Sequence, residues 1–370
     1  MRIVFISNLS SVKSLGPSWS VPARVKAQEK IDDVLWVNCT DAYIEHWSEV
    51  GCFHNLSEYG GKLTLSSLPS EYQNPDLVVF EDFYYPNCIK FHFELLKSKI
   101  PYIIVPRGAL TSPAQNKKWF KKRIANFLMF SHFLKKALAI QYLTLDEYRD
   151  STDKWNKNHV IIPNGISMPI IHKKEFSSYG INAVFIGRLN AYHKGIDLLI
   201  DAINSIKEEL RKVQFTLKMY GELNRDYELL KAQVLGYGLE DLISFEGEAF
   251  DDRKKQVLQK ADLFIMTSRF EGLPMGLLEA LAYGVPVIVT PGTNMATPVR
   301  EADAGWVTEP TIESIASSIM QAIGGRAEYD KKSKNARDLA AKYDWDILAQ
   351  RFHDEIHLLL TLKNRIGGNK

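Results

Sequence analysis

The chain has 370 residues, of which 45% are apolar and 24% charged, and its formal net charge is +2. This length exceeds one ordinary hydrophobic core, so two domains are expected. The small net charge argues against a dedicated nucleic-acid binder, which needs a strong basic field. Cys39, Cys52 and Cys88 contain no C-x-x-C pair, so we expect reduced thiols and a cytoplasmic setting. No apolar run reaches membrane-spanning length.

The first half of the chain alternates short apolar runs with helical stretches. Strands are predicted at 2–6, 34–37, 76–80, 102–105 and 139–143. Polar residues follow several of these runs, and three of them (Glu81, Asp82 and Arg107) are candidates to contact a ligand hydroxyl. Capping or surface positions are the alternative. Gly16, in the loop that follows the first run, offers backbone N–H groups to a phosphate, and an ordinary surface loop is the alternative there.

The segment KKWFKKRIANFLMFSHFLKKAL, residues 117–138, has seven Lys or Arg residues and no acid. Aromatic residues are interspersed with these cations. The pattern predicts a basic amphipathic helix that lies on an anionic membrane surface. A solvated basic face with the aromatic residues in the core explains the same pattern equally well.

The second half repeats the alternation of strands and helices. Strands are predicted at 183–187, 215–221, 242–247, 263–266 and 285–289, with a helix over 196–210. Near-continuous apolar strands separated by helices predict parallel sheets covered on both faces. We therefore expect two doubly wound Rossmann-like domains that face a central cleft. Residues 1–165 form the first, completed by a helix at about 345–365, and residues 166–344 form the second.

Two cations stand near the start of the second domain, in GRLNAYHKGIDLLIDA (187–202). Arg188 lies just past a predicted strand, and Lys194 with Gly195 opens the next helix. Two cations with a glycine that permits close backbone approach suit a diphosphate. Solvated surface cations are the alternative interpretation.

The stretch SRFEGLPMGLLEALAYGVPVIVT (268–290) predicts a strand end, a Gly-rich loop, a helix and another strand. Pro274 suits the first turn of the helix, and Gly284 suits its end. The loop directs the N-terminal N–H groups of the helix at an anion. Glu271 and Glu279 flank this position, which suits a ligand with both phosphate and hydroxyl groups.

These motifs together resemble glycosyltransferase family 4, the group 1 glycosyltransferases of the GT-B fold. The resemblance runs from about Ile161, at the junction IIPNGI, to about Val307, and more loosely over the rest. PRGAL (106–110) and TPGTNMA (290–296 region) are similar to the branch used in bacterial capsule and lipopolysaccharide assembly. The combined signal is specific, although no single motif is.

The resemblance implies a role for each matching residue. Arg188 and Lys194 would hold the donor diphosphate, and Glu279 would hold the ribose hydroxyls. Glu271 and the loop that follows it would orient the donor sugar, with Arg188, Lys194 and Glu271 as the catalytic set. The remaining donor-binding residues are Gly16, Gly221, Glu248, Gly272, Leu273, Pro274, Met275 and Gly276.

The resemblance also implies the reaction. We expect a retaining transferase that uses a nucleotide-diphosphate sugar as donor substrate, with no cofactor and no metal. The acceptor would be a glycan, lipid-linked in this branch, which would place the protein in the cytoplasm or peripherally on the inner face of the plasma membrane. One departure is that VVFEDFYYP (78–86) has Glu81 and Asp82 where many relatives carry a histidine near the attacking hydroxyl. The resemblance therefore implies that Glu81, Asp82 or Arg107 contacts the acceptor substrate.

Three alternatives remain. A GT-B sugar-nucleotide 2-epimerase shares the architecture, and the arrangement around Glu271 and Glu279 disfavours it. A NAD-dependent oxidoreductase would also have two doubly wound halves, but no G-x-G-x-x-G follows the first strand. A non-catalytic nucleotide-sugar-binding protein is the third alternative.

Overall fold

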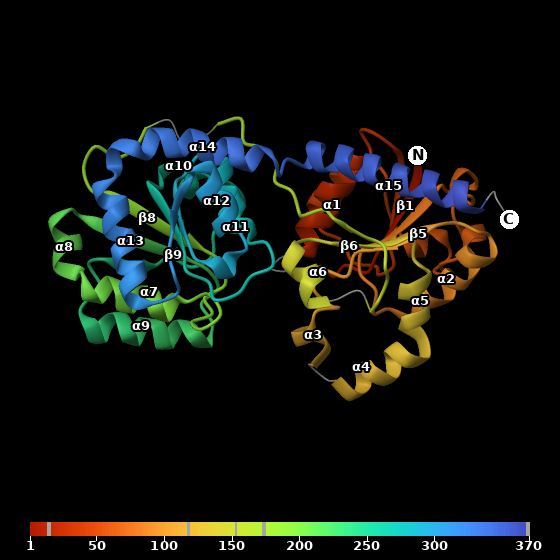
Figure 1. Cartoon of the computed structure of the whole chain (residues 1–370), viewed down its shortest axis with the longest axis horizontal. Coiled ribbons are helices and arrows are strands. Elements are labelled where there is room, and N and C mark those ends of the chain that lie inside the picture. The colour runs from red at the N-terminus through yellow and green to blue at the C-terminus, as the bar shows by residue number, and fades with distance from the viewer. Residues whose placement is uncertain (13–15, 117–118, 152–153, 172–174, 368–370) are drawn as a thin grey trace. The chain divides into compact units, whose positions relative to one another are not determined.

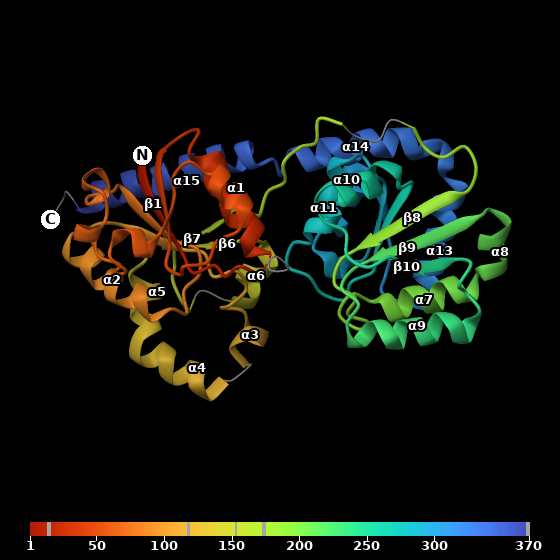
Figure 2. The ribbon, with the colours of Figure 1, turned by 180° about the vertical axis from the view of Figure 1, so that it is seen from behind.

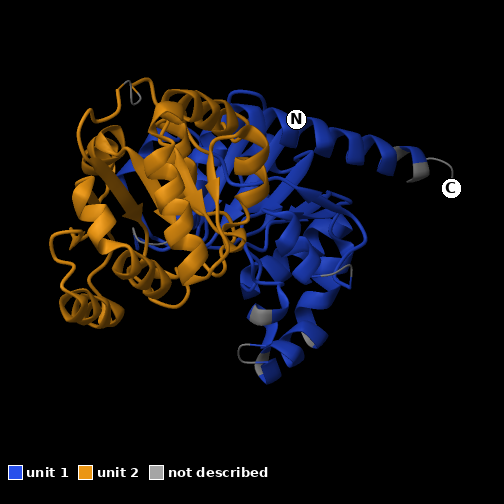
Figure 3. Ribbon diagram, turned by 60° about the vertical axis from the view of Figure 1, so that its left-hand side comes forward, with its two compact units in different colours: residues 1–165, 345–370 blue, residues 166–344 orange. Residues whose placement is uncertain are grey.

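The computed structural model describes residues 1–12, 16–116, 119–151, 154–171 and 175–367 (Figure 1). The chain divides into two compact units, which Figure 3 shows in different colours. The first unit comprises residues 1–165 and 345–370, and the second comprises residues 166–344. Each unit has its own sheet with helices packed on both faces (Figures 1 and 2).

The first unit is built on a parallel sheet of seven strands in the order β3-β2-β1-β4-β5-β6-β7. The strands are β1 (Arg2–Ser7), β2 (Asp33–Asn38), β3 (Phe53–Asn55), β4 (Leu77–Phe80), β5 (Tyr102–Ile104), β6 (Ala139–Tyr142) and β7 (His159–Ile161). Alternate residues of β1 pack on opposite faces, so that Ile3 and Phe5 join one core while Val4 and Ile6 join the other. Both faces of the sheet are therefore buried.

Helices cover this sheet on either side. They are α1 (Pro17–Gln28), α2 (Pro86–Lys97), α3 (Ser112–Asn116), α4 (Trp119–Ala125), the π-helix η5 (Asn126–Phe130), α5 (Ser131–Lys136), α6 (Leu145–Ser151) and α15 (Trp345–Gly367). Short 3₁₀ turns occur at Glu45–Glu49, Leu56–Tyr59, Leu65–Ser67 and Ser70–Tyr72. Helix α15 packs beside α1, and its Leu348, Phe352 and Ile356 belong to the same core as Ile3 and Phe5.

The second unit is built on a parallel sheet of six strands in the order β10-β9-β8-β11-β12-β13. The strands are β8 (Ile181–Ile186), β9 (Phe215–Tyr220), β10 (Ile243–Phe245), β11 (Leu263–Met266), β12 (Val287–Val289) and β13 (Gly305–Val307). The helices are α7 (Ile196–Ser205), α8 (Lys207–Lys212), α9 (Arg225–Tyr237), α10 (Asp251–Lys260), α11 (Met275–Ala282), α12 (Ala296–Ala302), α13 (Ile312–Gly324) and α14 (Tyr329–Ala341). Two 3₁₀ turns lie at Pro291–Thr293 and Arg326–Glu328.

Both sheets run outward from a central strand in one direction and then restart on its other side. The prediction of an α/β protein with two doubly wound parallel sheets is confirmed. The helix predicted over 196–210 is interrupted, because Ile206 has φ −126° and ψ 20°, outside the helical region. No helix among the described residues is long and apolar enough to cross a bilayer.

Candidate functional site

The second unit has a topological switch point between β8 and β11. These strands are neighbours in the sheet, and the chain leaves them toward opposite sides. In open α/β sheets, ligands bind in the crevice outside the carboxyl ends of the strands at this point. The loops that follow β8 and β11 contain Arg188, Lys194 and Glu271. The fold therefore brings together three residues predicted to bind the donor.

The two loops at the switch point are joined by specific contacts. The Arg269 guanidinium donates two hydrogen bonds to Asp197, of 2.7 and 2.9 Å. The backbone N–H of Arg269 also donates to the carbonyl oxygen of His193 at 3.0 Å. Gly195 has φ +64°, and a Cβ there would lie 2.1 Å from the carbonyl oxygen of Thr267. Only glycine permits this approach, so the sequence requires it at Gly195.

The cations of the site differ in their partners. Lys194 is 8% exposed and pairs with Glu271, whose carboxylate also accepts a 2.8 Å hydrogen bond from the Ser268 hydroxyl. Arg188 is exposed, and in the part of the chain that the structure describes its guanidinium makes no ion pair. The charge of Lys194 is thus compensated within the protein, whereas that of Arg188 faces solvent.

Helix α11 begins against the end of β8. A Cβ on Gly276 would lie 2.7 Å from the carbonyl oxygen of Ile186, so the glycine allows this packing. Pro274 is the N-cap of α11 and lies just before the first turn in which it was expected. The first N–H groups of a helix have no intrahelical acceptor and carry the positive end of its dipole. They therefore offer an anion a binding position next to Arg188.

The Gly-rich loop before α11 is held in place from the next strand loop. The Asn294 amide donates to the carbonyl oxygens of Glu271 and Gly272 at 2.7 and 3.0 Å. Leu273 and Met275, on either side of Pro274, pack partly against the core of the unit. Asn294 was not predicted as a site residue, although it lies in the quoted motif TPGTNMA. The motif was interpreted as a family marker and not as a source of side-chain contacts.

Glu279 lies one turn inside α11. Its carboxylate accepts a 2.6 Å hydrogen bond from Lys254 of α10, and the two side chains are 20% and 27% exposed. The Glu279 carboxylate is therefore partly accessible to a ligand hydroxyl. Lys254 was not predicted, because the surrounding DDRKKQ has the composition of any exposed helix and carries no motif.

The loops after β9 and β10 border the same edge of the sheet. The Gly221 N–H donates to the carbonyl oxygen of Gly247 at 2.9 Å. A Cβ on Gly221 would lie 2.1 Å from the carbonyl oxygen of Gly187, next to Arg188. Glu248 follows and is exposed. Gly221 and Glu248 therefore line the strand ends beside the switch point.

His193 is a further titratable neighbour of this site. Burial lowers its pKa, with the opposing charge of Glu271 as the next contribution. The positive charges of Lys194 and Arg188 lower the pKa of His193 further. Among the described residues no group of three or more His, Cys, Asp and Glu side chains is arranged to hold a metal ion.

The first unit also has a switch point, between β1 and β4, and its charged residues are buried. Glu81 is 1% exposed and accepts hydrogen bonds of 2.8 Å from Arg24 and 2.6 Å from Arg107. Burial by itself would raise the pKa of Glu81, but the two guanidinium groups hold it below its ordinary value. Arg107 has φ 50° and also donates to the Ser20 hydroxyl at 3.0 Å. Glu81 and Arg107 thus belong to a buried ion network.

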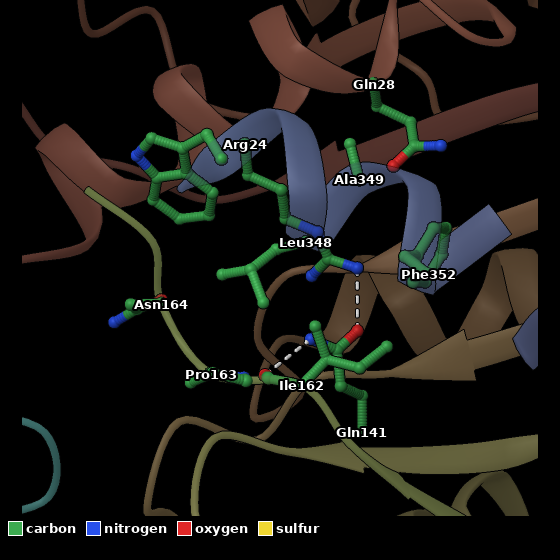
Figure 4. A pocket seen from close by; sticks show the side chains of 10 residues that line it. Arg24, Gln28, Gln141, Ile162, Pro163, Asn164, Leu348, Ala349 and Phe352 are labelled. Atoms are coloured by element: carbon green, nitrogen blue, oxygen red, sulfur yellow. Dashed lines mark hydrogen bonds between the residues drawn. The ribbon is translucent and has the colours of Figure 1, made fainter. Parts of the chain in front are cut away.

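Helix α15 covers this network from one side, where a small cavity lies (Figure 4). The Arg24 guanidinium donates to the Gln141 side-chain oxygen at 2.6 Å and lies 4.6 Å from the centroid of the Phe352 ring. Gln141 in turn donates to the carbonyl oxygen of Ile162 at 3.1 Å. The segment before residue 166, the sheet and the last helix are therefore linked through one buried arginine.

Asp82 and Gly16 lie nearer the surface of the first unit. The Asp82 carboxylate accepts a 2.7 Å hydrogen bond from the N–H of Phe83, no cation pairs with it among the described residues, and burial raises its pKa. Gly16 is the N-cap of α1 with φ −52°, a conformation open to any residue. The nearby hydroxyl of Ser18 donates to the carbonyl oxygen of Val12 at 3.2 Å, so it has a hydrogen-bond partner in the loop that precedes α1.

Comparison with known proteins gives a consistent result for the whole fold. The structure of Anabaena Alr3699/HepE in complex with UDP superimposes with a TM-score of 0.73 at 16% identity, over 96% of this chain and 100% of that one. The architecture is therefore that of the GT-B glycosyltransferases.

Sequence comparison identifies the family to which the second unit is similar. Residues 170–339 match the family model described as glycosyl transferases group 1. Mannosylfructose-phosphate synthase of Agrobacterium fabrum is 26% identical over 249 residues, 63% of this chain and 55% of that protein. GDP-mannose:cellobiosyl-diphosphopolyprenol alpha-mannosyltransferase of Xanthomonas campestris is 26% identical over 209 residues, 54% of this chain and 53% of that protein. The alignments thus span just over half the length of each relative. The resemblance to the group 1 glycosyltransferases is confirmed, and the second unit is a domain of that family.

Proposed function

We propose that the chain is a retaining, metal-independent glycosyltransferase that moves a sugar from a nucleoside-diphosphate sugar to a glycan acceptor. The observation that carries the proposal is the exposed Arg188, which makes no ion pair in the described structure. It follows Gly187, which lies against the Lys194 side chain, and Ile186, against which α11 begins. A diphosphate placed there would receive the charge compensation that a metal ion supplies in other enzymes.

The site residues divide the donor between them in this proposal. Arg188 and Lys194 hold the diphosphate and stabilise the negative charge that develops as the bond from the anomeric carbon to the phosphate oxygen breaks. Glu271 and the amides from Gly272 to Gly276 orient the sugar, and Glu279 accepts hydrogen bonds from the ribose. The loops at Gly221 and Glu248 border the base.

The acceptor would be bound on the first unit. We assign Asp82 to the attacking hydroxyl, and the assignment is supported by its carboxylate having no cationic partner among the described residues, unlike that of Glu81. In front-face attack the departing phosphate oxygen takes the proton of this hydroxyl. The new glycosidic bond then forms on the face that the nucleoside diphosphate leaves, so configuration is retained.

The acceptor is proposed to be a lipid-linked glycan in bacterial surface polysaccharide synthesis, at the inner face of the plasma membrane. The motifs PRGAL and TPGTNMA support this assignment, as does the name of the Xanthomonas relative, which specifies a diphosphopolyprenol acceptor. The name of the Agrobacterium relative specifies a sugar-phosphate product. A soluble sugar phosphate is therefore the acceptor to test against the lipid-linked one.

Donor binding is tested by calorimetry and thermal shift with a panel of nucleoside diphosphates and their sugars. We expect one nucleotide to bind, and Glu279→Ala to weaken it by about tenfold through loss of ribose hydrogen bonds. Glu209→Ala is the control, because Glu209 is exposed on α8. This helix leads into the amino-terminal end of β9, whereas the site lies at the carboxyl ends of the strands. If no nucleotide binds to the wild type, the proposed transferase activity fails at its first step.

A further inference from the structure

The segment that contains α4, η5 and α5 forms one helical arm of the first unit, residues 119–136. The backbone stays in the right-handed helical region at Ala125, Phe130 and Ser131, where the three elements join. In Figures 1 and 2 the α4 end of this arm stands away from the sheet of its own unit. The arm is therefore anchored at its C-terminal end.

The apolar side chains of the arm fall into two groups. Phe130 and Phe133, near the anchored end, are 4% and 0% exposed. Four large side chains nearer the free end are exposed to between 45% and 83%, namely Trp119, Phe120, Ile124 and Phe127. At about 100° per residue these four fall within roughly 140° of the helix circumference. They share one face of the helix, which also carries the exposed Arg123, and we name this the arm face.

Toward the free end of the arm, polar residues occupy the side that faces the protein. Lys122 donates a 2.6 Å hydrogen bond to the carbonyl oxygen of Ala114, and its ammonium lies 5.3 Å from the centroid of the Tyr84 ring. Asn126 is 8% exposed and donates to the Gln115 side-chain oxygen at 2.9 Å. An ordinary surface helix packs its apolar stripe on the core and exposes its polar side. The part of the arm toward its free end does the reverse, which indicates that the arm face meets a non-aqueous partner.

The residues around the arm face are basic, which indicates that its partner is anionic. No Asp or Glu occurs between Glu94 and Asp146 in the sequence. Arg123, Lys135 and Lys136 are exposed on the arm itself, whereas Lys117 and Lys118 lie outside the described residues. Tryptophan and phenylalanine beside Lys and Arg are the residues of helices that lie in the interface of an anionic bilayer.

We propose that the arm face binds the surface of an anionic phospholipid bilayer, with its four apolar side chains in the interfacial region. The acyl boundary would bury the exposed rings, and the acidic headgroups would neutralise the basic side chains. This surface deepens the proposed function, because a lipid-linked acceptor would be presented there. It does not depend on donor binding, so the two proposals fail separately.

The test is co-sedimentation of the full chain with vesicles, without any sugar substrate. We expect binding to vesicles that contain phosphatidylglycerol and little binding to phosphatidylcholine alone. Trp119→Ser with Phe127→Ser should lower the ratio of bound to free protein at least about tenfold, because two exposed rings no longer enter the lipid. Arg123→Glu with Lys135→Glu and Lys136→Glu should lower it by a similar factor and remove the preference for anionic lipid.

Matched controls come from the second unit. Leu229 and Leu235 are 63% and 53% exposed on α9, and replacing both with serine should leave sedimentation unchanged. Unchanged thermal unfolding of the arm variants would show that they fold. Equal sedimentation of wild type and Trp119→Ser with Phe127→Ser overturns the proposal. So does an oligomer that dissociates in this variant without any vesicle binding, because the arm face would then bind protein.

Discussion

Both units have a topological switch point, and the charged residues at the two points differ in burial and in ion pairing. At the ends of β1 and β4, Glu81 is buried between Arg24 and Arg107. At the ends of β8 and β11, Lys194 and Glu271 pair at the edge of the site, and Arg188 is exposed without an ion pair among the described residues. The first six strands of the first sheet and the six strands of the second follow the same order, so topology alone does not decide which charges a ligand can reach.

The difference teaches how to separate structural from functional charge in this fold. A buried carboxylate between two guanidinium groups has its hydrogen-bonding capacity used and its desolvation compensated. An exposed cation beside a helix N-terminus has no protein partner for its charge or its N–H groups. An anionic ligand would supply the opposite charge and accept the hydrogen bonds. Variants of the buried network in the first unit should therefore change stability, and variants of the exposed cation in the second unit should change activity.

The largest effect is expected from removal of α15, which covers the buried network of the first unit. A chain that ends after Lys342 loses Leu348, Phe352 and Ile356, which are 3%, 1% and 0% exposed. Each large buried side chain is worth about 2–5 kcal/mol, so the sum is comparable with the whole stability of a domain, about 5–15 kcal/mol. We expect the first unit to unfold, measured by thermal unfolding and limited proteolysis.

The control for this truncation is a chain that ends after Leu362, which keeps the three buried residues and should unfold like the wild type. A soluble and fully active chain ending after Lys342 would contradict the assignment of α15 to the core of the first unit.

A smaller effect is expected at the buried network itself. Glu81→Gln leaves Arg24 and Arg107 without their counter-charge and should lower the free energy of unfolding by about 3–5 kcal/mol. Because the folded pKa of Glu81 is lowered, its contribution is present above the unfolded pKa of about 4.3 and is lost as pH falls through the folded value. Urea unfolding at several pH values should show the difference from wild type shrinking in acid.

The exposed Glu45→Gln serves as the control for Glu81, with an expected change within about 0.5 kcal/mol. A Glu81→Gln protein as stable as the wild type at neutral pH would show that the buried network is not structural, and would remove the contrast between the two switch points.

The smallest change in stability and the clearest change in rate are expected at Arg188. Arg188→Ala should leave the free energy of unfolding within about 0.5 kcal/mol. It should lower kcat by about 10²–10³-fold, because the leaving diphosphate loses a cation. Product formation from the nucleotide sugar measures the rate, with Lys212→Ala on α8 as control. An unfolded Arg188→Ala protein would place this arginine with the structural charges.

Much of the fold could be predicted because buried parallel strands are continuous apolar runs. The runs at 2–6, 34–37 and 263–266 became β1, β2 and β11 with shifts of at most one residue at each end. Three edge or near-edge strands were not predicted: β3, β7 and β13 have three residues each. A run of three residues has no measurable periodicity, and only pairing with a neighbouring strand makes it a strand.

The candidate site could be predicted in part, from spacing. Glycines and a proline at fixed offsets marked the loops that hold Arg188, Lys194 and Glu271. The partners Lys254 and Asn294 come from other strand loops and helices, and no local pattern connects them with Glu279 or Glu271. The burial of Glu81 was equally inaccessible, because its neighbours Arg24 and Arg107 are distant in the chain.

The sequence by itself determined the alternation of strands and helices, the positions of the glycines where backbones meet, and the family of the second unit. These depend on local composition and short spacing, which a linear pattern contains. Only the tertiary structure decided which charges are buried, which carboxylate each lysine reaches, and that the aromatic residues of 119–136 divide between the core and the arm face. Burial and pairing depend on neighbours that are distant in sequence, and the fold alone brings those neighbours together.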